Sequence, residues 1–232
     1  PVWMRRPLGL MIELLAGIPS IIYGLWGALW LAPKLVGIFG WIMENWGNTE
    51  KHPWLAGWFA GDVFDGEAST GTGLLTSGIV LAIMIIPFIT SVMRDVFEIV
   101  PSVLKESAYG LGATTWEVVR NIVLPFTKIG VIGGLILGLG RALGETMAVT
   151  YIIGGSNHVA KIFTETGAFS IFSQGNSIAS TIALEFSEAT ETPLHISSLL
   201  LLGLTLFFIT FIVLSISKLL LLQLAKKEGA KS

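Results

Sequence analysis

Long apolar stretches without charged residues dominate the chain. Three intervals carry no Asp, Glu, Lys or Arg between their ends: Glu13–Lys34, Glu67–Arg94 and Glu191–Lys218. Each can hold the roughly 20 apolar residues that cross a hydrocarbon core of about 30 Å. A fourth apolar stretch, 129–151, carries only Arg141 and Glu145 near its middle. The pattern predicts an all-α integral membrane protein with about four transmembrane helices.

The predicted helices form a single transmembrane domain over residues 1–232. They lie near 8–31, 73–97, 126–153 and 194–225. Polar loops at 34–72 and 154–192 join them on one side of the membrane. Pro19 should kink the first helix, because a proline lacks the backbone N–H and its ring crowds the preceding turn.

Composition supports the membrane interpretation and excludes several kinds of partner. Hydrophobic residues make up 53% of the chain and charged residues 13%, against about 25% charged in a typical soluble domain. A net charge of −2, without a basic cluster interleaved with aromatic residues, argues against a nucleic-acid partner. The absence of Cys excludes disulfides and thiolate metal sites, and the three His are too scattered to suggest a metal site.

Positive charge is distributed unevenly between the two sides of the predicted domain. The loops at 34–72 and 154–192 together contain three Lys and no Arg, whereas the opposite side contains ten Lys and Arg. Cytoplasmic segments carry an excess of Lys and Arg near the membrane. We therefore predict that both ends of the chain and the polar segment that follows Arg94 are cytoplasmic.

That polar segment predicts a helical hairpin over residues 101–125. Pro101 is well placed to open a first short helix, and Gly112 permits the turn that follows. Thr114 and Glu117 have the spacing of a capping box, which would begin a second helix. This second helix should end near Leu124–Pro125.

The hairpin has more apolar residues than a solvated linker would need. They are Val103, Leu104, Ala108, Leu111 and Trp116. Such a surface could dock on a cytoplasmic partner, or it could lie on the lipid surface as an amphipathic hairpin. Composition alone does not separate these two interpretations.

Acidic, small and apolar residues recur at fixed distances within the hairpin. They are Glu106, Ser107, Ala108, Gly112, Ile122, Leu124 and Pro125. This spacing resembles the EAA loop of bacterial ABC importer permeases, with Ser107 in place of the second alanine. In that family the loop enters a groove of the ATPase subunit and transmits its closure to the membrane helices. The resemblance therefore implies a role in ATPase coupling for Glu106, Ser107, Ala108, Gly112, Leu124 and Pro125.

Four longer motifs extend the resemblance along the chain. They are Ile83–Pro87, Met93–Glu98, Lys105–Ala108 and Gly138–Thr150. Together they resemble the phosphate-specific importer permeases of the PstC type, from Ile12 to Ala225 and most weakly in the two loops. That family has six spanning helices, so we expect the chain to be the C-terminal part of a longer protein.

The resemblance implies a multi-pass permease subunit in the bacterial plasma (inner) membrane. It would form half of a translocation pathway for inorganic phosphate. The implied partners are a paralogous second permease subunit, two ATP-binding subunits, an external phosphate-binding protein and membrane lipid. No cofactor is expected in this chain, because ATP and Mg would be bound by the partner ATPase.

Arg141 and Glu145 are charged residues within a predicted membrane helix. Four residues apart, they would lie about 40° from each other on a helix, on the same face as Gly134 and Gly138. A charge at mid-bilayer costs roughly 2.5 kcal/mol or more, which makes such residues functional candidates. Either Arg141 offers its guanidinium to phosphate oxygens while Glu145 orients it, or the two form a buried ion pair that only fixes helix packing.

Catalysis by this chain itself is not expected. It has no Gly-x-x-x-x-Gly-Lys-Ser/Thr motif and no Gly-Lys dipeptide, and no nucleophile and base form a visible constellation. Three alternatives stay open: an ABC permease for molybdate, sulfate or an amino acid; a proton-coupled secondary transporter using Glu145 and Glu13; and a regulatory or scaffold membrane protein. Glu13, near the cytoplasmic face, is expected to reach the interface or pair with Arg5 or Arg6.

Overall fold

The computed structural model describes residues 2–46, 71–155, 174–186, 189 and 193–229. Within these ranges, four helical segments are long and apolar enough to cross a membrane: Ser20–Ile42, Leu74–Glu98, Thr115–Leu143 and Pro193–Lys226. The all-α membrane fold predicted from the sequence is therefore confirmed. Parts of the predicted loops, at 47–70, 156–173, 187–188 and 190–192, lie outside the described residues.

The chain divides into two compact units. Unit 1 comprises Pro1–Gly17, Ile85–Leu143 and Phe208–Ser232, and unit 2 comprises Ile18–Met84 and Gly144–Phe207. Two long helices, α5 (Leu74–Glu98) and α12 (Pro193–Gly229), contribute one part to each unit.

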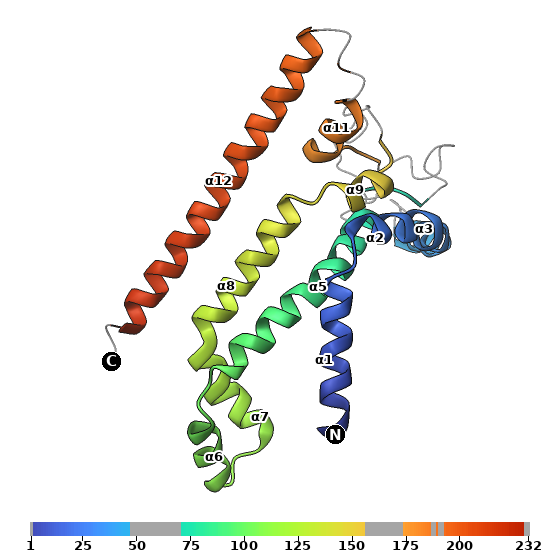
Figure 1. The fold of residues 1–232 in the computed structure, drawn as a ribbon. Coiled ribbons are helices and arrows are strands. Elements are labelled where there is room, and N and C mark those ends of the chain that lie inside the picture. Colours follow the sequence, from blue (N-terminus) through green and yellow to red (C-terminus); the bar gives the residue numbers. More distant parts are fainter. Residues whose placement is uncertain (1, 47–70, 156–173, 187–188, 190–192, 230–232) are drawn as a thin grey trace. The chain divides into compact units, whose positions relative to one another are not determined.

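Unit 1 contains α1 (Val2–Ala16), the second half of α5, the hairpin helices and α8 (Leu124–Leu143). The hairpin helices are α6 (Ser102–Gly110) and α7 (Thr115–Val118), which lie at the adjoining ends of α5 and α8 (Figure 1). The hairpin is thus joined covalently to two membrane helices.

A stripe of glycines brings α8 close to α5 within unit 1. A β-carbon added at Gly130 would lie 2.6 Å from Val96 Cγ1, and one at Gly138 would lie 2.6 Å from Ile89 Cδ1. Gly134, between them, would meet the side chain of Met93. The spacing of small residues every four positions lets helix backbones approach closely, and here that face meets α5.

Unit 2 is built around α2 (Ser20–Trp26), α3 (Ala32–Trp46), α9 (Met147–Ile152) and α11 (Ile178–Glu185). α2 packs against α9 through Gly24, where an added β-carbon would lie 2.9 Å from Ala148 Cα. Ile152 of α9 is fully buried, and a β-carbon added at Gly27 would lie 2.6 Å from Ile152 Cδ1. Small residues again set the distance between helices.

The first predicted helix is divided in two. α1 ends at Ala16, and Pro19, with φ −57° and ψ 135°, precedes α2. Pro19 has no N–H for a helical bond, and the residue before a proline avoids the helical region. The prediction of one helix over 8–31 with a kink at Pro19 was therefore wrong, because the chain leaves the helix between Ala16 and Ser20.

Two π-helical turns allow prolines inside continuous helical segments. η1 (Gly27–Leu31) precedes Pro33, and η3 (Val119–Val123) precedes Pro125. In both cases the residue before the proline donates its N–H to a carbonyl five residues back. A proline ring clashes with the carbonyl four residues back in a regular α-helix, and the wider π-turn relieves that clash.

These turns correct two predicted boundaries. The helix through Pro33 continues as α3 to Trp46, although a loop was predicted from residue 34. The second hairpin helix does not end near Leu124–Pro125, because η3 joins it to α8 in one segment, Thr115–Leu143. The second hairpin helix, η3 and α8 therefore form one continuous helical segment, which we call the α7–α8 rod.

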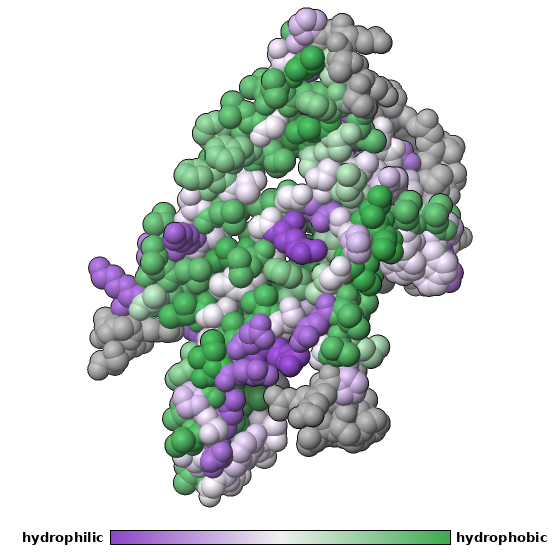
Figure 2. Space-filling model, viewed as in Figure 1, coloured by the Kyte–Doolittle hydropathy of each residue, from purple (hydrophilic) through white to green (hydrophobic). Residues whose placement is uncertain are grey.

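The long helix α12 exposes apolar side chains around most of its circumference. Figure 2 shows hydrophobic residues along its visible face. The exposed residues include Leu200, Leu201, Leu204, Phe207, Phe208, Phe211 and Ile212. An exposed apolar surface on a helix long enough to span the bilayer is suited to contact with lipid or other membrane helices.

Candidate functional site

The hairpin has a small hydrophobic core of its own. Val100, Ala108, Val118 and Val123 are buried together. Phe97, Ala113 and Ile122 pack around them. Because this core takes residues from the end of α5, from α6 and from the start of the α7–α8 rod, it fixes the hairpin to both membrane helices.

The capping box predicted at the start of the second hairpin helix is confirmed. The Thr114 N–H donates to Glu117 Oε2 at 2.7 Å, and the Glu117 N–H donates to Thr114 Oγ1 at 3.4 Å. The two bonds satisfy N–H groups that the first turn of a helix leaves without partners. The capping box therefore fixes the residue at which the turn ends and α7 begins.

Gly112 makes the turn between the hairpin helices. Its φ of +86° lies in the left-handed region, which glycine adopts without strain. Its N–H donates to the Tyr109 carbonyl at 2.9 Å. Nothing lies within 4 Å of a β-carbon added at this position, so the requirement for glycine comes from the backbone angle rather than from crowding.

The outer surface of the hairpin carries large apolar side chains. Leu111 is 90% exposed and Trp116 is 68% exposed, and Val103 and Leu104 are exposed as well. Ala108, in contrast, is buried in the hairpin core. Four of the five apolar residues singled out in the sequence thus remain on the surface, where they could contact a partner.

The predicted coupling residues divide into two groups. Glu106 and Ser107 are exposed on α6, and the Ser107 hydroxyl donates to the Val103 carbonyl at 2.7 Å. The structure brings them together with Ala108 and Gly112 in the hairpin. Leu124–Pro125 lie beyond η3 at the start of α8, where both are exposed.

Arg141 lies near the end of α8, in unit 1. Its side chain is exposed, and its guanidinium carbon lies 5.2 Å from the centroid of the Phe88 ring on α5. A cation over an aromatic face is held by the ring's electron density while its N–H groups stay available. Among the residues that the structure describes, no carboxylate lies within ion-pair distance of this guanidinium.

Glu145 lies between two helices instead of continuing α8. α8 ends at Leu143 and α9 begins at Met147, so the helix predicted over 126–153 is interrupted. Glu145 Oε1 accepts a hydrogen bond from the Ala148 N–H at 3.2 Å. A carboxylate favours the N-terminal end of a helix, and the prediction that Glu145 and Arg141 share one helical face was wrong for this reason.

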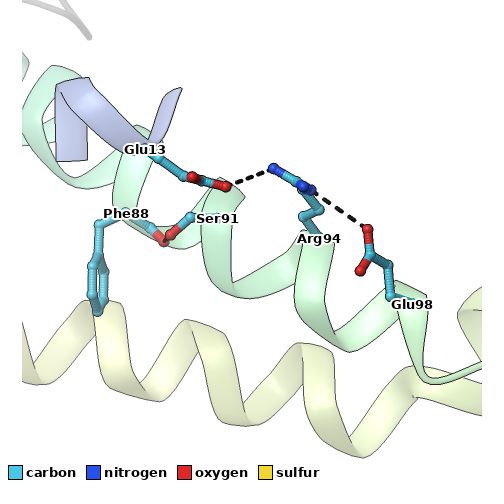
Figure 3. A network of polar contacts seen from close by, with 5 residues as sticks. All are labelled: Glu13, Phe88, Ser91, Arg94 and Glu98. Carbon is cyan, nitrogen blue, oxygen red and sulfur yellow. Dashed lines mark hydrogen bonds and ion pairs between the residues drawn. The ribbon is translucent and has the colours of Figure 1, made fainter. Parts of the chain in front are cut away.

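A third set of charges joins α1 to α5 within unit 1 (Figure 3). Arg94 Nη1 lies 2.6 Å from Glu13 Oε1, and Arg94 Nε lies 3.5 Å from Glu98 Oε1. The partner of Glu13 is therefore Arg94, which sequence reasoning did not identify.

The second predicted loop is described only in part. Ser177 and Ser180 form a capping box at the start of α11, and Glu185 Oε2 lies 3.0 Å from His195 Nε2. Glu188 and Glu191, which follow this helix in the sequence, lie outside the described residues.

Comparison with known proteins identifies similar chains. The family model for the binding-protein-dependent transport system inner membrane component matches residues 1–225. The phosphate transport system permease protein PstC of Pasteurella multocida is 54% identical over 237 residues, which cover 100% of this chain and 67% of that protein. No solved structure matches the chain.

Two further relatives agree with this match. The phosphate transport system permease protein PstC of Mesorhizobium japonicum is 50% identical and covers 98% of this chain and 64% of its own length. The protein of the same name from Haemophilus influenzae is 51% identical, with 99% and 67% covered. The chain thus spans about two thirds of the length of these relatives, and the resemblance noted in the sequence motifs is confirmed.

Proposed function

Because this chain belongs to the family of binding-protein-dependent transport system inner membrane components, we propose that it is the permease subunit of an ATP-driven importer for inorganic phosphate. The relatives described above carry phosphate transport in their names. The chain would form half of the translocation pathway. It would itself be non-catalytic, with ATP and Mg bound by a partner.

The exposed apolar surface of the hairpin carries the proposal. Leu111 and Trp116 lie on either side of a turn whose geometry is fixed by Gly112 and by the Thr114–Glu117 capping box. A rigid element with exposed aromatic and aliphatic side chains suits a protein interface better than a solvated loop. We assign its partner as an ATP-binding subunit on the cytoplasmic side.

The orientation required by this docking agrees with the charge distribution. Ten Lys and Arg lie on the side of the hairpin and the two ends of the chain, against three on the other side. Positive charge near the membrane favours the cytoplasm. Both ends of this chain would therefore be cytoplasmic, and the segments at 34–72 and 154–192 would face an external phosphate-binding protein.

Movement would pass from the hairpin to the membrane through its own core. Glu106 would make a polar contact at the docking surface, and Gly112 would hold the turn. Because Val100, Val118 and Val123 are packed together, closure of two ATP-binding subunits would displace the ends of α5 and α8 as one body. This displacement would switch a pathway shared with a paralogous second permease subunit between outward and inward access.

Arg141 is our candidate for contact with phosphate. Its guanidinium, held over Phe88, keeps N–H donors in a planar fork that matches phosphate oxygens. Glu145 would act through the backbone, because its carboxylate caps α9.

Phosphate-stimulated ATP hydrolysis tests the function. The full-length subunit would be purified with its partner subunits, placed in vesicles and supplied with the external binding protein and phosphate. We expect the rates of ATP hydrolysis and of solute uptake to rise when phosphate is added, and not when molybdate, sulfate or amino acids are added. Stimulation by one of those solutes would reassign the substrate, and uptake driven by a proton gradient without ATP would reject the importer class.

A further inference from the structure

The ion pair between Glu13 and Arg94 connects α1 to the last turns of α5. The two side chains are joined at 2.6 Å across 81 residues of sequence. Arg94 also lies 3.5 Å from Glu98, one turn further along α5 (Figure 3). The guanidinium is thus held between a carboxylate on its own helix and one on a different helix.

The last turn of α5 is part of the hairpin body. Phe97 packs against the hairpin core and Val100 is buried inside it. The Lys105 ammonium of α6 donates to the Phe97 carbonyl at 3.5 Å. Any displacement of the hairpin therefore displaces this turn of α5, and Arg94 with it, because a packed core transmits strain rather than absorbing it.

Gly9 provides the space that the Arg94 guanidinium occupies on α1. A β-carbon added there would lie 2.6 Å from Arg94 Nη1. Gly9 is buried, and it precedes Glu13 by four residues, so the two lie on one face of α1. One face of α1 thus provides both the space for the Arg94 guanidinium, at Gly9, and a carboxylate that pairs with it, at Glu13.

We propose that Arg94 is a positioning residue that carries the movement of the hairpin to α1. The proposal rests on the function proposed above, in which an ATP-binding subunit displaces the hairpin. When the end of α5 moves, Glu13 follows the guanidinium and draws α1 along. The helix that precedes the break at Pro19 then moves with the hairpin, although nothing in the hairpin core reaches it.

A role in coupling can be separated from a role in stability at this site. The side chains of Arg94 and Glu13 are 48% and 52% exposed. Exposed ion pairs contribute little to folding stability. Removing this one should therefore leave the amount and melting temperature of the complex nearly unchanged, while the number of phosphate ions imported per ATP falls.

Charge reversal and exchange test the proposal in the complete reconstituted complex. We expect Glu13→Lys and Arg94→Glu each to lower phosphate uptake per ATP hydrolysed by about fivefold or more, the range of ordinary coupling free energies. The exchanged pair, Glu13→Lys with Arg94→Glu, made together with Glu98→Gln so that no like charge lies one turn away on α5, should recover most of the ratio. If Glu13 and Arg94 acted through separate contacts, the exchanged variant would not regain the uptake ratio.

Two further variants act as control and as an independent probe. Glu98→Gln removes the pair within α5 and keeps the pair to α1, so it should leave the uptake ratio unchanged. Gly9→Leu fills the space of the guanidinium without changing charge, so it should lower the ratio as Glu13→Lys does.

The outcomes distinguish this inference from the proposed function. If the wild-type complex couples ATP hydrolysis to phosphate uptake and the reversed variants keep the wild-type ratio, the role of Arg94 is rejected and the function stands. Failure of the exchanged pair to recover the ratio, in a complex that assembles normally, also rejects it. A wild-type complex that shows no phosphate-stimulated hydrolysis rejects the function itself.

Discussion

Gly138 of α8 lies against Ile89 of α5 so closely that a β-carbon at position 138 would be 2.6 Å from Ile89 Cδ1 and 2.7 Å from Cγ1. Carbon atoms in van der Waals contact are about 3.5–4.0 Å apart. The absence of a side chain at this position therefore sets how near the two helices approach.

Substitution of Gly138 should separate α8 from α5. We expect Gly138→Leu to lower the free energy of unfolding by about 1–3 kcal/mol, the usual cost of overpacking. Thermal unfolding of the purified subunit complex measures the effect. Gly133→Leu is the matched control on the same helix, because nothing lies within 4 Å of a β-carbon there. Equal melting temperatures for the two variants would contradict the close contact.

Trp116 should act at the interface with the ATP-binding subunit. Its side chain is largely exposed, so Trp116→Ala should leave the subunit stable. Truncation of an interface hot spot costs about 2 kcal/mol or more, which corresponds to about 30-fold weaker binding. Retention of the ATP-binding subunit during purification at graded concentrations measures this loss. Asn121→Ala, at an exposed polar position of η3, is the control, and equal retention by both variants would argue against docking at Trp116.

Thr114 should control the order of the first turn of α7. Thr114→Ala removes the side-chain acceptor of the capping box, at a cost of about 1 kcal/mol, or about fivefold faster local amide exchange. Hydrogen–deuterium exchange of the peptide that covers 115–118 measures the change. Thr115→Ala, which alters the neighbouring threonine and keeps both bonds of the box, should exchange at the wild-type rate. Unchanged exchange in Thr114→Ala would mean that packing alone orders this turn.

Arg141 should be needed for uptake and not for assembly. Arg141→Gln removes the charge over Phe88, and we expect phosphate uptake to be lost while the complex assembles normally. Arg141→Lys keeps a charge and loses the planar fork, so its uptake should lie between the wild type and Arg141→Gln. Radiolabelled phosphate uptake into vesicles measures both. Normal uptake by a well-folded Arg141→Gln variant would reject contact with phosphate.

Features that depend on neighbouring residues could be predicted from the sequence. The apolar runs predicted the membrane helices because their length must match the bilayer. The Thr114–Glu117 capping box could be predicted because both of its hydrogen bonds join residues only three positions apart. The sequence placed Gly134 and Gly138 on one face of α8, although it did not say that α5 packs against that face.

Features that depend on packing or on competing local bonds could not be predicted. Proline ended a helix at Pro19 and was accommodated by a π-turn at Pro125, and the sequence offers no simple rule for the difference. Between α8 and α9 the Ala148 amide donates to the Glu145 carboxylate, a local bond that a continuous helix would not need. Glu13 and Arg94 lie 81 residues apart, so only the packing of α1 on α5 reveals their pair.

The contacts of Leu111 in the assembled transporter test whether the hairpin binds an ATP-binding subunit on the cytoplasmic side. A photoreactive amino acid at position 111, where the side chain is 90% exposed, would be activated in intact cells that express the complete complex. We expect one dominant adduct, to the ATP-binding subunit, that shifts when ATP hydrolysis is blocked. Adducts to lipid alone, or labelling of this position by a membrane-impermeant reagent added outside the cell, would contradict the proposed docking.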